Sequence, residues 1–384
     1  MIFSYLRTTS FRNLADARIF TGAKDVFLVG ENGQGKTNFL EALYFCAYAS
    51  SFRSARDSEI AHNGEKDFSA EVQIGETAGS KKNGVTPGIA SELLVKFEKG
   101  KKTVLIDGKR VEDRKDLLAI APCIVFCHED MEFVAGSPER RRWFFDQTLS
   151  LCDPVYLDDF RRYRQVLKSR NAVLRDHALR RLSGSPEPLL DALDLQYVHY
   201  GIKLMEKRET AARLFSEVFG PLYEEVSGIS EIMVRYAPSW KNAGDGVPLE
   251  TQAGLLRERR AADLGSGVSL SGPHRDRYVF TKNGAEFAGK ASTGQRRLLA
   301  LLLRVAQARR FSEMTGKNPV LLLDDVLLEM DGEKRRRFLS VLPGYDQAFY
   351  TFLPEEPYQR YRREDTLVYY ADGGKIGPAT PYSH

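Results

Sequence analysis

Eight residues near the start of the chain have the types and spacing of a phosphate-binding loop. They fit the pattern G-x-x-x-x-G-K-[ST] at every defined position and read Gly30-Glu31-Asn32-Gly33-Gln34-Gly35-Lys36-Thr37. Three glycines let the backbone curl so that its N–H groups point at an anion. Lys36 is expected to reach the β- and γ-phosphates, and the Thr37 hydroxyl to hold Mg²⁺. The loop therefore predicts a site for a nucleoside triphosphate.

Two acids late in the chain could complete such a site. Four apolar residues, Val320 to Leu323, are followed directly by Asp324 and Asp325. A buried strand that ends in carboxylates places them at a sheet edge, where Asp324 would bind Mg²⁺ directly or through water. Asp325 would polarise an attacking water. The alternative is a core strand that ends in acids without such a role.

A second short loop could contact the same nucleotide. Ser292-Thr293-Gly294-Gln295 precedes a strong helical pattern from Leu298 to Phe311. A loop at a helix N-terminus is a candidate anion site. The four-residue pattern is weak alone and gains value from its position between the glycine loop and the acidic strand.

The segments that should position these residues show both strand and helix patterns. Val26–Val29 is a short apolar run before the glycine loop, and a helical pattern follows it. Strand patterns occupy both ends of the chain, with hairpin turns at Asp107-Gly108 and Asn283-Gly284. The expected strands fall in residues 2–7, 15–21, 68–111, 123–126, 276–282, 320–324, 347–352 and 366–371. We therefore expect an α/β fold whose core combines both ends of the chain.

Between these ends, residues 135–260 predict a helical arm. Asp153-Pro154 is a helix start, and a heptad-like seam follows from Tyr156 to Leu174. A second seam runs from Leu190 to Val218, so two long helices should form an antiparallel hairpin. The expected outer face carries Arg161, Arg162, Arg164, Lys168, Arg170, Arg175, Arg180 and Arg181. These cations fit either a solvated face or phosphate contacts along a duplex. Arg53 likewise fits either a phosphate contact or a solvated loop.

Composition narrows the class of protein. The 384 residues are 42% hydrophobic and 28% charged, with a formal net charge of +4, which permits nucleic-acid binding without demonstrating it. No apolar run reaches the ~20 residues of a membrane helix, and no signal-peptide pattern opens the chain, so we expect a cytoplasmic location. The four cysteines are too few for a disulfide framework, and Cys123, Cys127 and His128 favour packing over metal binding.

The order of glycine loop, Ser-x-Gly-Gln and Asp-Asp resembles the ABC-type ATPases. The long helical separation between the first two resembles the SMC-related branch and, within it, the RecF family of bacterial repair and replication proteins. The residues that carry this closer resemblance are Phe11-Arg12-Asn13-Leu14, Gly30 to Asn38, Ser51-Phe52-Arg53, Gly136 to Arg142, Gly272-Pro273-His274-Arg275-Asp276, and Leu323 to Val326 with Glu329 and Asp331. The resemblance implies an ABC-type head from 1–134 and 261–384, and a helical arm, lobe II, from 135–260.

The resemblance also implies a mechanism. Two subunits would hold ATP and Mg²⁺ between them. One subunit would supply the glycine loop and the residue after it, Gly30 to Asn38, and the other would supply Ser292, Gly294 and Gln295. Thr37 and Asp324 would hold the metal, with Lys36 and Asp325 as catalytic residues. The ATP-dependent homodimer would clamp gapped DNA, help RecO and RecR to load recombinase, and use slow, DNA-stimulated hydrolysis to time release. Arg277, Thr293 and Leu328 depart from the family pattern, and the last two put the dimer contacts in doubt.

Other functions fit the sequence less well. A transporter ATPase should have a switch histidine where Tyr350-Thr351-Phe352 stands, and a P-loop kinase needs no Ser-x-Gly-Gln loop. A structural SMC-like linker needs a much longer coiled coil. Another SMC-like DNA-maintenance ATPase remains the alternative to the RecF family.

Overall fold

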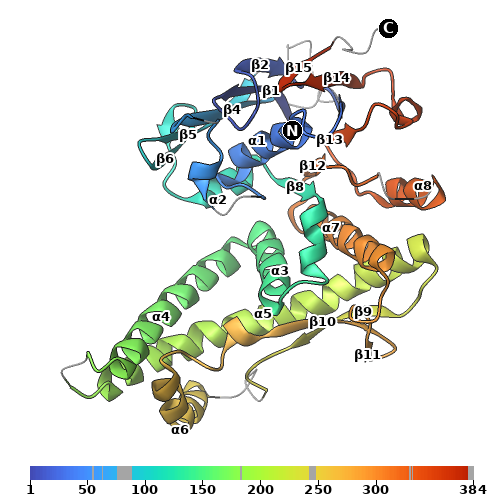
Figure 1. Cartoon of the computed structure of the whole chain (residues 1–384). Helices are drawn as coiled ribbons and strands as arrows, with labels where there is room; N and C mark the ends of the chain where they lie inside the picture. The colour runs from blue at the N-terminus through green and yellow to red at the C-terminus, as the bar shows by residue number, and fades with distance from the viewer. Residues whose placement is uncertain are drawn as a thin grey trace. The chain divides into compact units, whose positions relative to one another are not determined.

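The computed structural model describes residues 1–53, 56–62, 64–75, 89–181, 184–241, 248–327, 330 and 332–378. The chain divides into two compact units, which are described separately. Unit 1 combines Met1–Asp130 with Phe311–His384, and unit 2 is Met131–Arg310. The chain is therefore a mixed α/β protein in which both ends build one unit, and a largely helical unit is inserted between them in the sequence (Figure 1).

A mostly parallel sheet forms the centre of unit 1. Its order is β15 (Lys375–Gly377), β14 (Leu367–Asp372), β3 (Asp25–Val29), β13 (Gln347–Phe352), β12 (Val320–Leu323) and β8 (Cys123–Phe126). Only β15 runs antiparallel to its neighbour. Every residue of β3, β8, β12 and β13 is buried, as expected for parallel strands with both faces covered. The pairing of β3 with β13 and β14 confirms that the two ends of the chain share one core.

An antiparallel sheet forms a second layer of unit 1. Its order is β2 (Ala17–Phe20), β1 (Ile2–Thr9), β4 (Phe68–Gly75), β5 (Ile89–Glu98), β6 (Lys101–Ile106) and β7 (Lys109–Arg110). The turn after β6 places Asp107 and Gly108 at φ 51° and 75°, which confirms the predicted hairpin. Helix α1 (Lys36–Tyr48) shares one apolar core with strands of both sheets and buries eight apolar residues in it. Two short helices, α2 (Arg114–Ile120) and α8 (Gly332–Val341), complete the unit.

Long helices dominate unit 2. They are α3 (Pro138–Cys152), α4 (Pro154–Ala178), α5 (Glu187–Ser227), α6 (Leu249–Ser266) and most of α7 (Thr293–Thr315). The Asp153 carboxylate caps α4 by accepting from the backbone N–H groups of Val155 and Tyr156 at 2.8 and 3.1 Å. Tyr156, Tyr163 and Tyr197 are buried in the core between α4 and α5. The predicted helical hairpin is therefore confirmed.

Unit 2 also holds a three-stranded sheet in the order β11 (Ala285–Glu286), β10 (Arg277–Lys282) and β9 (Ile232–Ala237). Strand β9 lies in the stretch that we expected to be helical, and sequence reasoning missed it. Burial alternates along the strand, since Ile232 and Val234 are buried and Met233 between them is exposed. Its pairing with β10 draws the later strand into unit 2. Residues 261–310, which we expected in the head, accordingly belong to the same unit as the arm.

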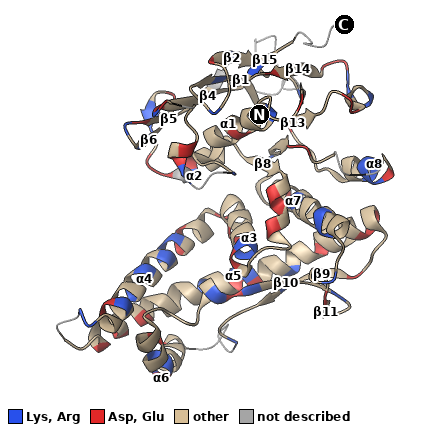
Figure 2. Cartoon of the chain, viewed as in Figure 1, with Lys and Arg blue, Asp and Glu red and all other residues tan. Residues whose placement is uncertain are grey.

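Lys and Arg residues recur along α4, where they are coloured blue in Figure 2. Seven of the eight predicted outer-face cations are exposed: Arg161, Arg162, Arg164, Lys168, Arg175, Arg180 and Arg181. The prediction was wrong for Arg170, whose side chain is 0% exposed. Its guanidinium is compensated inside the unit by the carboxylates of Asp194 and Asp263, each 2.7 Å away. None of the helices in the described part of the chain is both long enough and apolar enough to span a membrane.

Candidate nucleotide-binding site

The glycine loop lies where the sequence predicted, between β3 and α1. Gly33 and Gly35 have φ angles of 81° and 108°, in the left-handed region that favours glycine, and Gly35 precedes the first turn of α1. A Cβ on Gly30 would lie 2.6 Å from the carbonyl oxygen of Ala371 in β14, so this position also requires glycine. The loop thus has the backbone conformation that directs N–H groups toward an anion at a helix N-terminus.

Lys36 is held across this loop. Its side chain is buried, and the ammonium group donates hydrogen bonds to the carbonyl oxygens of Gly30 at 2.6 Å and Glu31 at 3.1 Å. A positive charge fixed over the loop, next to the α1 N-terminus, favours a polyanion at this position.

Two neighbouring segments brace the loop from outside. Asn13 donates to the Gly33 carbonyl at 2.9 Å and accepts from the Asn38 amide at 2.7 Å. On another side, the β14–β15 turn donates from the Gly373 N–H to the Gln34 side-chain oxygen at 2.6 Å and from the Gly374 N–H to the Gln34 carbonyl at 3.1 Å. Sequence reasoning found Asn13 only through the family resemblance and missed the turn.

Arg53 lies at the side of α1. It donates to the Asn38 side-chain oxygen at 2.9 Å, and its guanidinium is 3.8 Å from the Glu41 carboxylate. Glu41 is fully buried and also pairs with Arg12 at 2.8 Å. The Arg53 side chain is therefore positioned by the helix that follows the glycine loop.

Thr37 and Asp324 are in contact at the N-terminus of α1. The Thr37 hydroxyl donates to the Asp324 carboxylate at 2.9 Å. Burial raises the pKa of Asp324 to about 7, and repulsion from Asp325 adds to the rise, whereas hydrogen bonds from Thr37 and Thr351 oppose it. A desolvated carboxylate beside a hydroxyl is a pair of hard oxygen ligands that a divalent cation would stabilise.

Thr351, at the end of β13, links both acids. Its hydroxyl accepts from the backbone N–H of Asp325 at 2.7 Å and lies 2.8 Å from the Asp325 carboxylate and 3.3 Å from that of Asp324. Asp325 itself has φ 50°, a strained conformation for a non-glycine residue. The sequence indicated only that Thr351 lies near the end of an expected strand, and no motif signalled its contacts.

The Ser292 loop belongs to unit 2, whereas the glycine loop and Asp324 belong to unit 1. The Ser292 N–H donates to the Gln295 side-chain oxygen at 2.9 Å, and the Gln295 N–H donates to the Ser292 hydroxyl at 3.3 Å. This reciprocal cap fixes the start of α7. Ser292 and Gly294 are exposed. The loop is therefore an ordered, accessible helix N-terminus.

Two further motif segments meet inside unit 2. Arg142 donates to the Asp276 carbonyl at 2.7 Å, and Asp276 accepts from the buried Arg208 at 2.9 Å. These residues fix the Gly272–Asp276 segment in the arm core and give it a structural role. Leu328, Glu329 and Asp331 lie outside the described residues. In the described part of the chain, no three His, Cys, Asp or Glu side chains cluster as a metal site would need.

Comparisons with known proteins identify the family of the chain. A family model described as the RecF/RecN/SMC N terminal domain matches residues 2–366. The DNA replication and repair protein RecF of Treponema pallidum (strain Nichols) is 42% identical over 95% of this chain and 98% of its own length. The protein of that name from Bacillus subtilis (strain 168) is 33% identical over 91% of this chain and 93% of its own length.

Solved structures show the same architecture. A structure of the recombination mediator protein RecF-ATP in the RecFOR pathway superposes with a TM-score of 0.85 at 25% identity, over 97% of this chain and 96% of that one. A Smc head bound to the C-winged helix domain of ScpA superposes with a TM-score of 0.51 at 15% identity, over 98% and 96% of the two chains. The second likeness concerns the fold alone.

Proposed function

Since the chain belongs to the RecF family of DNA replication and repair proteins, we propose that it is an ATP-dependent DNA-binding protein. The observation that carries the proposal is the contact of Thr37 with Asp324, because it joins the glycine loop to the acidic strand end in one site. The solved relative described as RecF-ATP supports the choice of nucleotide.

Within this site, residues Gly30 to Asn38 bind the ATP phosphates, and Lys36 neutralises charge on the β- and γ-phosphates. Thr37 and Asp324 would hold Mg²⁺, which when bound offsets the charge that develops during phosphoryl transfer. Their oxygens fit this ion, because Mg²⁺ favours one or two protein oxygens together with phosphates. Asp325, held by Thr351, orients the attacking water.

Hydrolysis by this site should be slow. The residue next to the metal-binding acid is Asp325, whose side chain is one methylene shorter than the glutamate common in related ATPases. Its reach toward a water is correspondingly shorter, so the proposed ATPase activity is weak, and DNA binding stimulates it. ATP then acts mainly as a ligand that selects one conformation, and hydrolysis times its release.

The complete site requires a second copy of the chain. We propose that the exposed Ser292 and Gly294 of one subunit, together with Gln295, close over ATP held by the other, in a dimer with two-fold symmetry. Dimer closure brings two basic arms onto DNA at a single-strand gap, where their arginines contact phosphates. The description of one relative as part of the RecFOR pathway supports RecO and RecR as partners in loading recombinase, in the cytoplasm.

A mobility-shift titration of gapped duplex tests this function. ATP should strengthen binding for the natural chain, and Lys36→Ala should remove the effect of ATP. Replacing Arg164 and Lys168 together with Glu should weaken binding, whereas Arg213→Glu, also exposed in unit 2 but paired with Glu217, should change it little. Binding that is indifferent to ATP and to the α4 charges would contradict the proposal.

A further inference from the structure

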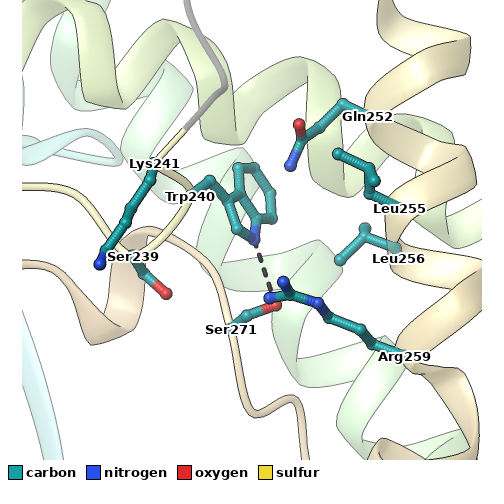
Figure 3. A pocket seen from close by; sticks show the side chains of 8 residues that line it. All are labelled: Ser239, Trp240, Lys241, Gln252, Leu255, Leu256, Arg259 and Ser271. Atoms are coloured by element: carbon teal, nitrogen blue, oxygen red, sulfur yellow. Dashed lines mark hydrogen bonds between the residues drawn. The ribbon is translucent and has the colours of Figure 1, made fainter.

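A cavity of about 350 Å³ lies inside unit 2, between the loop that follows β9 and helix α6 (Figure 3). Its lining includes no residue of the glycine loop, the acidic strand end or the Ser292 loop. The volume is within the range of small-ligand sites and is sufficient for one nucleoside. The function proposed above leaves this cavity without a role.

One wall of the cavity is apolar and rigid. The Trp240 indole is 4% exposed and donates its N–H to the Ser271 hydroxyl at 3.2 Å. The ring also packs against Gly201 of α5, where an added Cβ would lie only 2.6 Å from it. Leu255 and Leu256 extend from α6 toward the indole (Figure 3). The wall therefore offers a fixed apolar surface to a flat ligand.

A buried polar residue lines the same space. Gln252 is 3% exposed and lines the cavity, and its side-chain oxygen has no hydrogen-bond partner among the described residues. A buried amide oxygen without a donor is unfavourable, and buried polar groups in folded proteins are nearly always paired. Rotation of the amide group toward the cavity would let a ligand N–H group supply the missing partner.

Two cations lie at the rim of the cavity. Lys241 and Arg259 are exposed and line it, and neither has an ion-pair partner within the described parts of the chain. By contrast, the neighbouring Arg257 and Arg260 of the same helix are both paired with Asp191. Lys241 and Arg259 thus remain available for an anionic group next to the apolar wall.

We propose that this cavity binds one unpaired nucleotide of single-stranded DNA. The base lies against Trp240 and donates an N–H to Gln252, while its phosphate contacts Arg259 and Lys241. Every DNA base combines an aromatic face with an N–H donor and an adjacent phosphate, which is the combination that these walls complement. The inference rests on the proposed function in DNA binding and assigns to unit 2 a contact with the unpaired strand.

The test uses Trp240 as its own reporter. The chain has two tryptophans, so Trp143→Phe leaves Trp240 as the single strong fluorophore. Titration of the full chain with the tetranucleotide dT4, without ATP, should quench its emission to saturation. In this background Gln252→Leu and Arg259→Ala should each raise the Kd for dT4 about tenfold. Arg257→Ala removes the same charge from the same helix outside the cavity and should leave the Kd unchanged.

Gln252→Leu also separates ligand binding from a structural role. The substitution removes a buried oxygen that has no partner, so the urea midpoint of unfolding should hold or rise while dT4 binding weakens. A Kd unchanged by both cavity substitutions would overturn the proposal. Saturable quenching by inorganic phosphate alone, or equal quenching by an acidic, leucine-containing tetrapeptide, would also overturn it, since neither carries a base.

A parallel mobility shift distinguishes the two proposals. If gapped duplex binds in an ATP-dependent way but dT4 does not quench Trp240, the cavity proposal fails and the proposed function stands. If dT4 quenches as expected but ATP does not affect duplex binding, the ATP-dependent function fails and the cavity remains a nucleotide site.

Discussion

The Thr37 hydroxyl donates a hydrogen bond to the Asp324 carboxylate at 2.9 Å, although the two residues are 287 positions apart. The contact exists because β3, which leads into the glycine loop, and β12, which Asp324 follows directly, flank β13 in one parallel sheet. The carboxyl ends of parallel strands meet at one edge, where ligands of open α/β sheets bind. The site is therefore a direct product of joining the two ends of the chain.

Removing the charge of Asp324 should weaken the binding of ATP only when Mg²⁺ is present. Asp324→Asn keeps the side-chain size and loses a metal ligand, so we expect affinity for ATP with Mg²⁺ to fall about tenfold or more. Calorimetric titration with Mg²⁺ and with EDTA measures the difference. Thr37→Ser retains the hydroxyl and should bind nearly as the natural chain does. A metal-holding role would be refuted if Asp324→Asn bound ATP with the same affinity as the natural chain when Mg²⁺ is present.

Thr351 should affect turnover more than binding. Thr351→Val has the same shape but leaves the Asp325 N–H without its acceptor and frees the carboxylate, so kcat should fall roughly tenfold. The Kd for ATP should stay within about twofold, because Thr351 has no expected contact with the phosphates. Thr351→Ser should restore turnover. A loss of ATP binding that parallels the loss of kcat would instead assign Thr351 to the stability of the whole site.

The β14–β15 turn should control the conformation of the glycine loop. A Cβ at Gly374, where φ is 84°, would lie 1.8 Å from the Asn13 carbonyl oxygen, so Gly374→Ala must displace the turn that contacts Gln34. We expect a loss of about 2–4 kcal/mol of stability and a weaker affinity for ATP. Gly377→Ala is the control, because it lies in β15 with no atom within 4 Å of the added Cβ. Unchanged ATP affinity in Gly374→Ala would show that the loop does not depend on this turn.

Acidification should destabilise unit 2 through His274. Burial lowers the pKa of His274 to about 4, and its ring lies 3.0 Å from both the Tyr163 hydroxyl and the Ser269 carbonyl. Because the folded pKa is below that of the unfolded chain, the unfolded state binds the proton first and stability falls as pH drops below about 6.5. The loss from pH 7 to 5 should be about 2 kcal/mol.

Urea unfolding followed by tryptophan fluorescence measures this effect, since both tryptophans lie in unit 2. His274→Gln cannot titrate, so its stability should depend less steeply on pH by the same amount. Parallel pH dependences for the natural chain and His274→Gln would show that another group is responsible.

Local chemistry made much of the fold predictable. The glycine loop, the Asp153 cap and the Asp107-Gly108 turn depend on residues adjacent in sequence, and the structure has the expected conformation at each. The apolar runs of β3 and β12 were equally clear because parallel strands are buried on both faces. Asp324 could be placed near Thr37 because an acid at the end of a buried strand, in a chain that has a phosphate-binding loop, is expected to bind the Mg²⁺ of the nucleotide.

The features that the sequence did not predict depend on contacts between segments that are far apart in the chain. Arg170 reads as an exposed cation, and only the fold brings Asp194 and Asp263 to it. Strand β9 is short, and its position depends on pairing with β10, 45 positions later at its start. The roles of Thr351 and Gly374 likewise arise from contacts with distant segments and leave no motif.

Mixing two inactive variants tests the shared ATP site most directly. Lys36→Ala lacks a working glycine loop, and Ser292→Arg blocks the loop that should act on the partner's ATP. Each alone should neither form a dimer with ATP, as judged by sedimentation, nor hydrolyse it. A heterodimer of the two contains one intact composite site, so the equimolar mixture should recover up to roughly a quarter of the natural ATPase rate. A mixture as inactive as its components, or Ser292→Arg active alone, would contradict a site shared between two subunits.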